Sequence, residues 1–256
     1  MREWIYGRNP VYEALKARRR QFYRLLVAEG AQEKGRLEEI LRLCQAHRLA
    51  VEQAPRARLE AIDPGSQGVA LETGSYPYSN LPDILMLSES HSEPLFVLVL
   101  DALQDPQNLG TLLRTAEAVG VHGVLLPRRR AATVTPAVVS ASSGACEHLL
   151  VAQMNLAQAI RELKQAGAWV VGLETGQLVE RVERARLDGA LALVVGSEGE
   201  GMRALVRDSC DVLVQLPMRG QVASLNAAVA GSIALYLAWQ GRGAGENDLS
   251  QKVESG

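Results

Sequence analysis

The sequence predicts an α/β protein of about two domains, in which the second domain is a mostly parallel sheet covered by helices on both faces. From residue 95 onward, short apolar runs of strand length alternate with longer runs of helical periodicity, which is typical of such a sheet. The length of 256 residues exceeds that of most single domains. Between residues 74 and 93 the chain becomes rich in Ser, Pro, Tyr and Asn, a composition that indicates a connector.

The N-terminal part, residues 1–75, is expected to form a small α/β module. Its longest helix should cover 33–47, where Leu37, Ile40, Leu41 and Cys44 recur at helical spacing. A shorter helix is expected at 10–17. Strands are expected at 22–28, 49–52 and 68–72, and they complete the module.

The connector is placed at 76–93, with a short helical turn at 84–87, and the second domain at 94–241. The apolar runs of this domain predict strands at 95–100, 124–126, 169–173, 191–195 and 212–216. Helices are expected at 109–119, 156–166, 202–208 and 225–239. The last helix is rich in Ala, whose small side chain allows a chain segment or a second subunit to approach closely; an ordinary buried helix is the alternative. The tail, 242–256, contains few apolar residues and is expected to be disordered.

The composition argues against several classes of function. Apolar stretches are too short to cross a bilayer and the N-terminus lacks a signal-peptide core, so we expect a cytoplasmic protein with no membrane partner. Cys44, Cys146 and Cys210 lie far apart and the four histidines are scattered, so neither a disulfide framework nor a metal site is expected. Ser197 lacks the Gly-x-Ser-x-Gly context of a nucleophile elbow.

Positive charge is concentrated at the N-terminal end of the chain. Residues 1–60 carry 13 Lys and Arg against 8 Asp and Glu, whereas the whole chain has a formal charge of −2. Arg18, Arg19, Arg20 and Arg24 flank two aromatic residues, a pattern that suits RNA as well as it suits a solvated helix end. A second cluster, 128–130, consists of three arginines at an expected loop, and on its own it favours solvated surface.

Four polar or glycine-rich segments follow the apolar runs of the second domain. They are 105–110 with Arg114, 196–201, 217–220 and 224–226. Loops beyond the ends of parallel strands are where open α/β sheets bind ligands. We therefore expect an enzyme whose site lies in the second domain.

The turn at 196–201 reads Gly-Ser-Glu-Gly-Glu-Gly and carries two acids. Glu198 and Glu200 would repel a phosphate, so their charge favours a neutral or cationic ligand such as S-adenosylmethionine. A plain strand-to-helix turn, in which acids favour the helix N-terminus, is the alternative. Arg114 points away from the apolar face of its helix, so it need not be buried.

Together these residues resemble a known family. Asp105-Pro106-x-Asn108-Leu109-Gly110 with Arg114, Gly196-Ser-Glu-Gly-Glu-Gly-Met202, and Pro217-Met-x-Gly220 with Ser224-Leu225-Asn226 look like the three motifs of the SpoU branch of the SPOUT methyltransferases, also called the TrmH family. Their order and spacing agree with that family, and the resemblance runs from about residue 4 to residue 239. The opening, residues 5–11, further resembles the family's ribosomal RNA guanosine 2′-O-methyltransferases.

The resemblance implies more than the pattern does. It implies a deep trefoil knot in the C-terminal α/β domain, an exception to the usual absence of knots, and a small N-terminal RNA-binding domain. It also implies S-adenosyl-L-methionine as cofactor, a homodimer as the working form and 23S ribosomal RNA as the substrate. The alternatives are a transfer RNA 2′-O-methyltransferase of the same family and a non-catalytic RNA-binding factor in ribosome assembly.

The same resemblance assigns expected roles to individual residues. The cofactor would be held by Gly196, Gly201, Leu216, Pro217, Met218 and Leu225. Arg114 would be the central catalytic residue, supported by Glu198, Asn226, Asn108 and Ser224. Because a guanidinium scarcely deprotonates, anchoring a phosphate and stabilising the developing alkoxide fit Arg114 better than a role as general base. One departure concerns 138–147, where many members of the family carry a lysine ahead of the Ser-x-Gly-Ala-x-Glu stretch; this chain has none, so no RNA contact from that side chain is expected.

Overall fold

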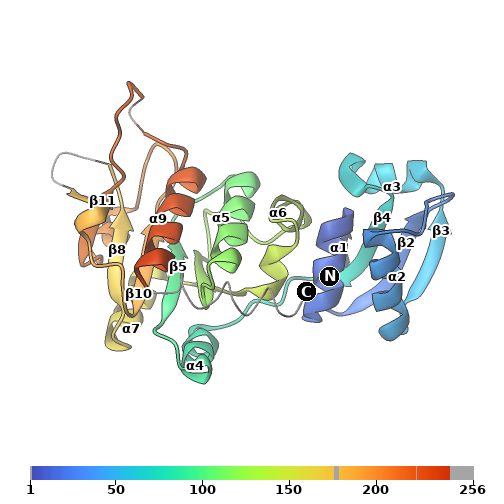
Figure 1. Cartoon of the computed structure of the whole chain (residues 1–256), viewed down its shortest axis with the longest axis horizontal. Helices are drawn as coiled ribbons and strands as arrows, with labels where there is room; N and C mark the ends of the chain where they lie inside the picture. The colour runs from blue at the N-terminus through green and yellow to red at the C-terminus, as the bar shows by residue number, and fades with distance from the viewer. Residues whose placement is uncertain (1, 176–178, 223, 243–256) are drawn as a thin grey trace. The chain divides into compact units, whose positions relative to one another are not determined.

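The computed structural model describes residues 2–175, 179–222 and 224–242 (Figure 1). Its larger sheet has seven strands in the order β7-β6-β5-β10-β8-β11-β9, and every neighbouring pair is parallel. The expected mostly parallel sheet is therefore confirmed. The strands are β5 Phe96–Leu100, β6 Gly123–Pro127, β7 Leu150–Met154, β8 Trp169–Leu173, β9 Glu180–Arg181, β10 Leu191–Val195 and β11 Val212–Gln215.

Helices cover both faces of this sheet. On one face, α4 Leu81–His91 and α7 Leu156–Gln165 pack on buried side chains of the central strands. On the other, α9 Ala227–Gly241 ends with the Arg242 guanidinium 4.7 Å from the centre of the Phe96 ring. Thr115 of α5 Pro106–Ala118 shares a 2.9 Å hydrogen bond with Ser232 of α9, which joins the two helices. A short α8, Ala204–Arg207, precedes β11.

The strand order creates a switch point at the centre of the sheet. From β5 the chain adds β6 and β7 on one side, whereas β10, β8 and β11 lie on the other side. Loops that leave the carboxyl ends of two such strands diverge, and the crevice between them is the usual ligand site of an open α/β sheet. The segments after β5 and β10 are those that the sequence singled out.

A second, smaller sheet forms near the N-terminus. It has four strands in the order β1-β4-β2-β3, with bounds β1 Arg2–Tyr6, β2 Phe22–Ala28, β3 Ala50–Ala54 and β4 Val69–Gly74. Its helices are α1 Arg8–Ala17, α2 Arg36–Ala46 and α3 Arg56–Ile62, and a 3₁₀ turn, η1, spans Pro64–Ser66. The expected α/β module is present, but β1 and α3 were not predicted.

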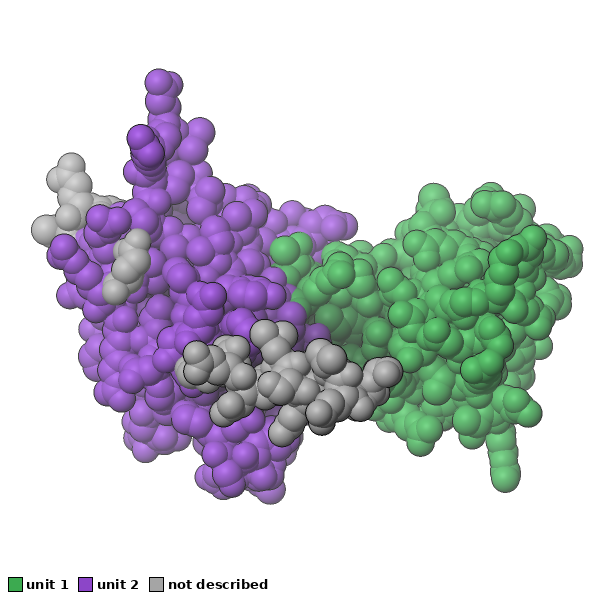
Figure 2. Space-filling view, in the orientation of Figure 1, with its two compact units in different colours: residues 1–77, 109–114, 133–148 green, residues 78–108, 115–132, 149–256 purple. Residues whose placement is uncertain are grey.

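The chain divides into two compact units (Figure 2). Unit 1 comprises 1–77, 109–114 and 133–148, and unit 2 comprises 78–108, 115–132 and 149–256. Unit 1 therefore takes in part of α5, together with α6 Pro136–Ala141 and the 3₁₀ turn η2 Ala145–His148, from the segment expected for the second domain. The expected tail lies outside the described residues from 243 onward.

The expected connector contains a regular helix where only a short turn was predicted. Asn80 accepts a 3.0 Å hydrogen bond from the Asp83 backbone N–H, and the Asp83 carboxylate accepts one from the Asn80 N–H, which forms a capping box for α4. Leu81 and Ile84 are buried against the sheet. Gly123 permits this packing, because a Cβ there would lie 2.4 Å from the Ile84 Cδ1.

Two of the four arginines near residue 20 form ion pairs within unit 1. The Arg20 side chain is fully buried and donates to Glu147 at 2.7–3.1 Å and to Glu3. Arg24 pairs with Glu52 and Glu72 at 3.1 and 2.7 Å. The charge of these two arginines is therefore balanced by carboxylates within unit 1, at a buried site for Arg20 and at a partly exposed one for Arg24.

The cysteines behave as the small apolar residues that the sequence indicated. Cys44 and Cys146 are buried, Cys210 is partly buried, and none of the three is in a disulfide. Burial raises the pKa of the Cys44 thiol to about 11 and that of Cys146 to about 12, so both stay protonated at neutral pH. Within the described part of the chain, no helix is both long and apolar enough to span a membrane.

Candidate functional site

Two tight glycine contacts shape the loop that follows β10. Ser197 and Gly201 exchange backbone hydrogen bonds of 3.0 and 3.1 Å, which closes residues 197–201 into a turn. A Cβ on Gly196 would lie 2.3–2.6 Å from backbone atoms of Gly201 and Met202, so only glycine fits at that position. Gly201 has φ of 68°, in the left-handed region that favours glycine. We call residues 196–201 the glycine turn.

A buried carboxylate holds the end of the glycine turn to the end of β5. Asp101 follows β5, is fully buried, and accepts 2.8 and 2.6 Å contacts from the Arg203 guanidinium. It also accepts a 2.8 Å hydrogen bond from the Arg203 backbone N–H. Neither Asp101 nor Arg203 was selected from the sequence. Asp101 nevertheless directly follows an apolar run, as the selected segment at 196–201 does.

Three expected site residues from different segments meet at one carboxylate. Glu198 Oε1 accepts from Asn108 Nδ2 at 2.9 Å, from Asn226 Nδ2 and, more weakly, from the Ala227 N–H at 3.4 Å. Asn226 Nδ2 also lies 3.1 Å from Asn108 Oδ1. These side chains follow β5, β10 and β11, so the topology brings them together as expected for loops at the carboxyl edge of the sheet.

Asn226 has a second task at the start of α9. Its Oδ1 accepts from the N–H groups of Ala228 and Val229 at 2.9 and 3.1 Å, which is the geometry of an N-cap. The amide is thus fixed at both ends: its oxygen caps the helix and its nitrogen donates to Glu198. The helix N-terminus, where backbone N–H groups favour negative charge, points at that carboxylate.

A cavity of about 200 Å³ opens beside the glycine turn. Seven expected residues line it: Gly196, Glu198, Gly201, Leu216, Met218, Ser224 and Leu225. The other lining residues are Leu173, Glu174, Thr175, Val195, Ser197, Gly199, Glu200, Ala227 and Ala230. Pro217, Asn108 and Asn226 are not among the lining residues.

The cavity wall is acidic and partly apolar. Glu174, Glu198 and Glu200 line it, whereas its described lining includes no Lys or Arg. Glu174 directly follows β8, the neighbour of β10 in the sheet, and a Cβ on Gly201 would lie 3.1 Å from its Oε1. A ligand with positive charge or hydroxyl donors and an apolar part suits this wall better than a phosphate does. Glu174 was not singled out from the sequence.

Arg114 is exposed and belongs to unit 1. Its Nη1 donates to Ser143 Oγ at 3.1 Å, and Ser143 has φ of 54°. Arg114 lies on α5 six residues after Asn108, which corresponds to about 9 Å along the helix axis. It is not among the residues that line the cavity, and its expected catalytic role stays a prediction.

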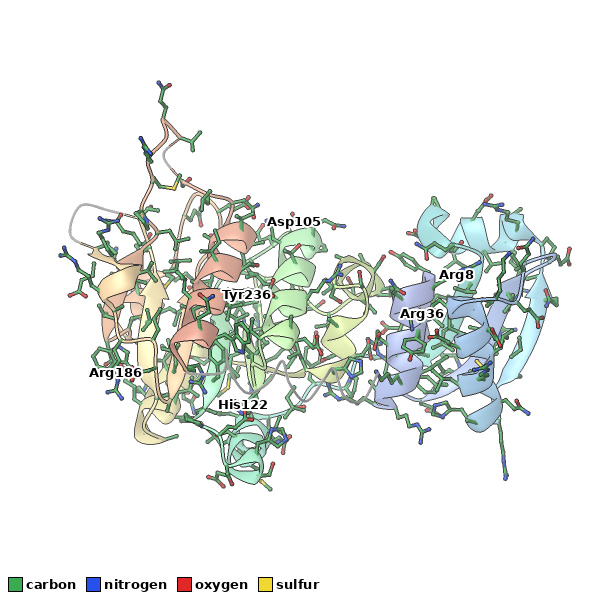
Figure 3. All side chains as sticks on the ribbon, in the orientation of Figure 1. Arg8, Arg36, Asp105, His122, Arg186 and Tyr236 are labelled. Atoms are coloured by element: carbon green, nitrogen blue, oxygen red, sulfur yellow. The ribbon has the colours of Figure 1, made fainter. Side chains whose placement is uncertain are left out.

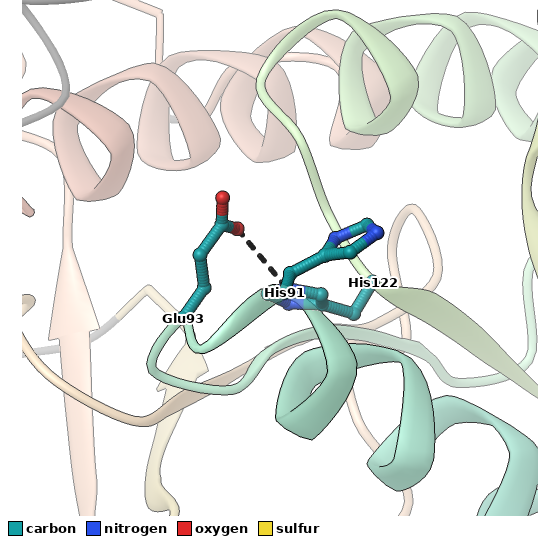
Figure 4. Close-up of side chains that lie close together, drawn as sticks. All are labelled: His91, Glu93 and His122. Carbon is teal, nitrogen blue, oxygen red and sulfur yellow. Dashed lines mark ion pairs between the residues drawn. The ribbon is translucent and has the colours of Figure 1, made fainter.

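A cluster of His91, Glu93 and His122 has spacing compatible with a metal ion (Figure 4). His122 Nδ1 accepts a 3.0 Å hydrogen bond from the Phe96 N–H, so the neutral ring carries its proton on Nε2. That nitrogen lies 3.2 Å from Glu93 Oε2, near enough for an ion pair, but without hydrogen-bond geometry. Since binding a metal through Nε2 would require loss of this proton, we assign no metal to the cluster.

Comparison with known proteins identifies two matching families along the chain. Residues 95–236 match the SpoU rRNA Methylase family, and residues 4–79 match the family described as RNA 2′-O ribose methyltransferase substrate binding. A TrmH family tRNA/rRNA methyltransferase of Bacillus subtilis is 41% identical over 94% of this chain and 96% of its own length. A Staphylococcus aureus protein of the same description is 41% identical over 91% and 93%.

Solved structures share the fold. The SpoU methyltransferase AviRb from Streptomyces viridochromogenes, in complex with AdoMet, has a TM-score of 0.78 at 23% identity and covers 95% of this chain and 92% of its own. A structure described as an RNA 2′-O ribose methyltransferase has a TM-score of 0.75 at 26% identity, with coverages of 94% and 88%.

Proposed function

We propose that this chain methylates a guanosine of 23S ribosomal RNA in the cytoplasm. The chain belongs to the SpoU rRNA methylase family, also called TrmH, and is an RNA 2′-O-ribose methyltransferase that uses S-adenosylmethionine. One observation carries the proposal. The glycine turn bounds an acidic cavity, and the carboxylate at its rim is held by Asn108 and Asn226. The proposal includes the knotted path of the family for residues 94–241.

The residues of the cavity fit the cofactor. The backbone of the glycine turn can contact a flat base closely, since Gly196 and Gly201 present no side chain, and Leu216 and Leu225 supply apolar surface. The three carboxylates suit an ammonium, a sulfonium or ribose hydroxyls. When bound, S-adenosylmethionine supplies an electrophilic methyl group. No basic lining side chain opposes that positive charge in the described wall.

The chain's own residues would act mainly by positioning. Asn108, Glu198 and Asn226 fix one another, so the rim of the cavity is ordered before RNA arrives. Arg114 would hold an RNA phosphate and stabilise the negative charge that develops on the 2′-oxygen as its proton is lost. The bond from the 2′-oxygen to the methyl group would form as the bond from the methyl group to sulfur breaks, with S-adenosylhomocysteine as the leaving group. The hydroxyl proton leaves to solvent or to a nearby acceptor.

An exposed apolar face on α9 supports a homodimer as the working form. Val229, Ile233 and Tyr236 are 46%, 40% and 48% exposed and follow one another at helical spacing (Tyr236 is labelled in Figure 3). A contiguous apolar face of this kind marks an interaction site, and a twofold dimer buries the same face on both subunits. Sedimentation of the wild type and of Tyr236→Glu tests this part of the proposal.

The activity is tested with tritiated S-adenosylmethionine and purified ribosomal and transfer RNAs. Label in 23S RNA alone, mapped to a guanosine 2′-oxygen, is the expected outcome. Label in transfer RNA would indicate a transfer RNA 2′-O-methyltransferase, which carries out the same reaction on a different substrate. Absence of label from both RNAs, with cofactor binding intact, would favour a non-catalytic RNA-binding factor.

Arg114→Ala tests the catalytic assignment. We expect methylation to fall below detection while S-adenosylmethionine binding, measured by calorimetry, stays within about twofold of wild type, since Arg114 does not line the cavity. Ser143→Ala is the matched control, because it removes the hydrogen-bond partner of Arg114 and keeps the guanidinium. Loss of cofactor binding in Arg114→Ala would contradict the assignment.

A further inference from the structure

The three arginines that follow β6 form an exposed group of positive charge at the carboxyl edge of the larger sheet. Arg128, Arg129 and Arg130 are all exposed, although Leu126 and Pro127 just before them are buried. We call these three residues the arginine loop. Across residues 2–175, 179–222 and 224–242, none of the three has a carboxylate within ion-pair distance.

The arginine loop is anchored on one side by the Arg128 side chain and on the other by the backbone that follows the loop. Arg128 Nε donates to the Gln153 carbonyl of β7 at 3.3 Å. After the loop, the Ala132 N–H donates to the Leu103 carbonyl at 2.7 Å, and Leu103 is buried. Arg130 has φ of 59°, so the chain turns sharply between these two anchors. The charges are therefore presented by a defined turn.

The anchor at Leu103 places the arginine loop beside the candidate site. Leu103 lies between Asp101, which holds Arg203 at the end of the glycine turn, and Asp105, which caps the helix that carries Asn108. β6 is separated from β10 only by β5, so the ends of β6 and β10 are two strand spacings apart, about 10 Å. Asp101 and Asp105 are the acids nearest in sequence to the anchor; Asp101 pairs with Arg203, and Asp105 Oδ1 accepts the Gln107 N–H.

The arginine loop contrasts with the N-terminal arginines. Arg20 and Arg24 contact two carboxylates each, so they offer little charge to a polyanion. The charge of the arginine loop remains available. Guanidinium groups pair with phosphate oxygens in a bidentate way, and such contacts set the register of a nucleic acid without reading its sequence.

From these observations we propose that the arginine loop binds backbone phosphates of the RNA that flank the target nucleotide. The proposal rests on the proposed function, since it assumes an RNA substrate at the carboxyl edge of the sheet. It assigns the loop a positioning role. The arginine loop would hold the strand while Arg114 and the residues around Glu198 act on the target.

The test measures how RNA binding depends on salt in the full-length protein. Fluorescence anisotropy with a labelled single-stranded RNA of mixed sequence, about 20 nucleotides long, gives the binding constant between 50 and 300 mM KCl. The variant replaces Arg128, Arg129 and Arg130 by Gln. The control replaces Arg161, Arg186 and Arg207 by Gln, an equal change of formal charge on exposed arginines of unit 2 that are outside the loop. Arg186 and Arg207 pair with Asp188 and Asp208.

Three lost phosphate contacts should make the slope of log K against log salt shallower by about 2 for a single strand. At about 0.1 M salt we expect RNA binding to weaken at least tenfold, with S-adenosylhomocysteine binding unchanged. The control should keep most of the wild-type slope. Equal slopes for the arginine-loop variant and wild type, or equal losses in the variant and the control, would overturn the proposal.

Failure of the proposed function gives a different result. If the wild type binds cofactor and RNA but transfers no label, the activity is wrong, while the salt slopes still decide whether the arginine loop contacts RNA. If the arginine-loop variant loses methylation at saturating RNA but keeps the wild-type slope, the loop acts on the site and not on phosphates, and the proposal fails.

Discussion

Glu147→Gln is expected to destabilise unit 1 by about 3 kcal/mol, because it leaves a buried guanidinium without its main counter-charge. Arg20 and Glu147 have fully buried side chains, and three of their atom pairs lie at 2.7–3.1 Å. Removing one partner of a buried pair costs roughly 3–5 kcal/mol. Glu3, which is partly exposed, still contacts Arg20, and the Gly74 carbonyl accepts at 3.2 Å, so the lower end of that range applies.

Urea unfolding, followed by circular dichroism and by hydrogen exchange of β2 and β4, measures the effect on unit 1. Glu52→Gln is the matched control, because Glu52 pairs with Arg24 at 3.1 Å but is 41% exposed, and exposed pairs contribute less than about 1 kcal/mol. The double variant Arg20→Met, Glu147→Met should recover much of the loss, since it removes both charges together. The reasoning is refuted if Glu147→Gln unfolds within 1 kcal/mol of wild type.

Three further predictions concern the site and the histidine cluster. Asn226→Ser keeps a good N-cap for α9 but removes the donor to Glu198, so methylation should fall at least tenfold while stability changes by less than about 1 kcal/mol in urea unfolding. Glu174→Gln removes one carboxylate from the cavity wall, so calorimetry should show S-adenosylmethionine losing about fivefold in affinity, about 1 kcal/mol, and neutral S-adenosylhomocysteine losing less. Burial lowers the pKa of His122 below its unfolded value of about 6.5, so its contribution to stability is complete above that pH and is lost as pH falls through the folded pKa. The variant His122→Asn keeps an acceptor for the Phe96 N–H but has no group that titrates at this position. The unfolding free energy of the variant should therefore fall less than that of wild type between pH 8 and pH 5.5.

The sequence was most informative where strands end in polar turns. The apolar runs before Asp101 and Gly196 predicted β5 and β10, and the residues after them meet around Glu198 as expected. This success has a physical basis, since buried parallel strands are continuous apolar runs and their loops share one edge of the sheet. Glu174 and Asp101 obey the same rule and could have been found by applying it to every strand.

Elements that depend on distant partners were not predictable in the same way. In the connector, the surrounding Ser, Pro, Tyr and Asn hid the helical spacing of Leu81, Ile84 and Leu85, where α4 begins at a capping box and packs Leu81 and Ile84 on the sheet. The charge pattern around Arg20 could not show that Glu147, 127 residues away, neutralises it. Local composition reports which charges are present but not which of them remain unpaired after folding.

In the proposed homodimer, the two roles of Asn226 would link cofactor binding to subunit association. Its amide joins the rim of the cavity to the first turn of α9, and the proposed dimer face lies one to three turns further along that helix. Any shift in Glu198 on cofactor binding is transmitted to the start of α9, and coupling between two binding events is reciprocal. In the proposed dimer, the factor by which cofactor changes the affinity between subunits would equal the factor by which dimerisation changes the affinity for cofactor.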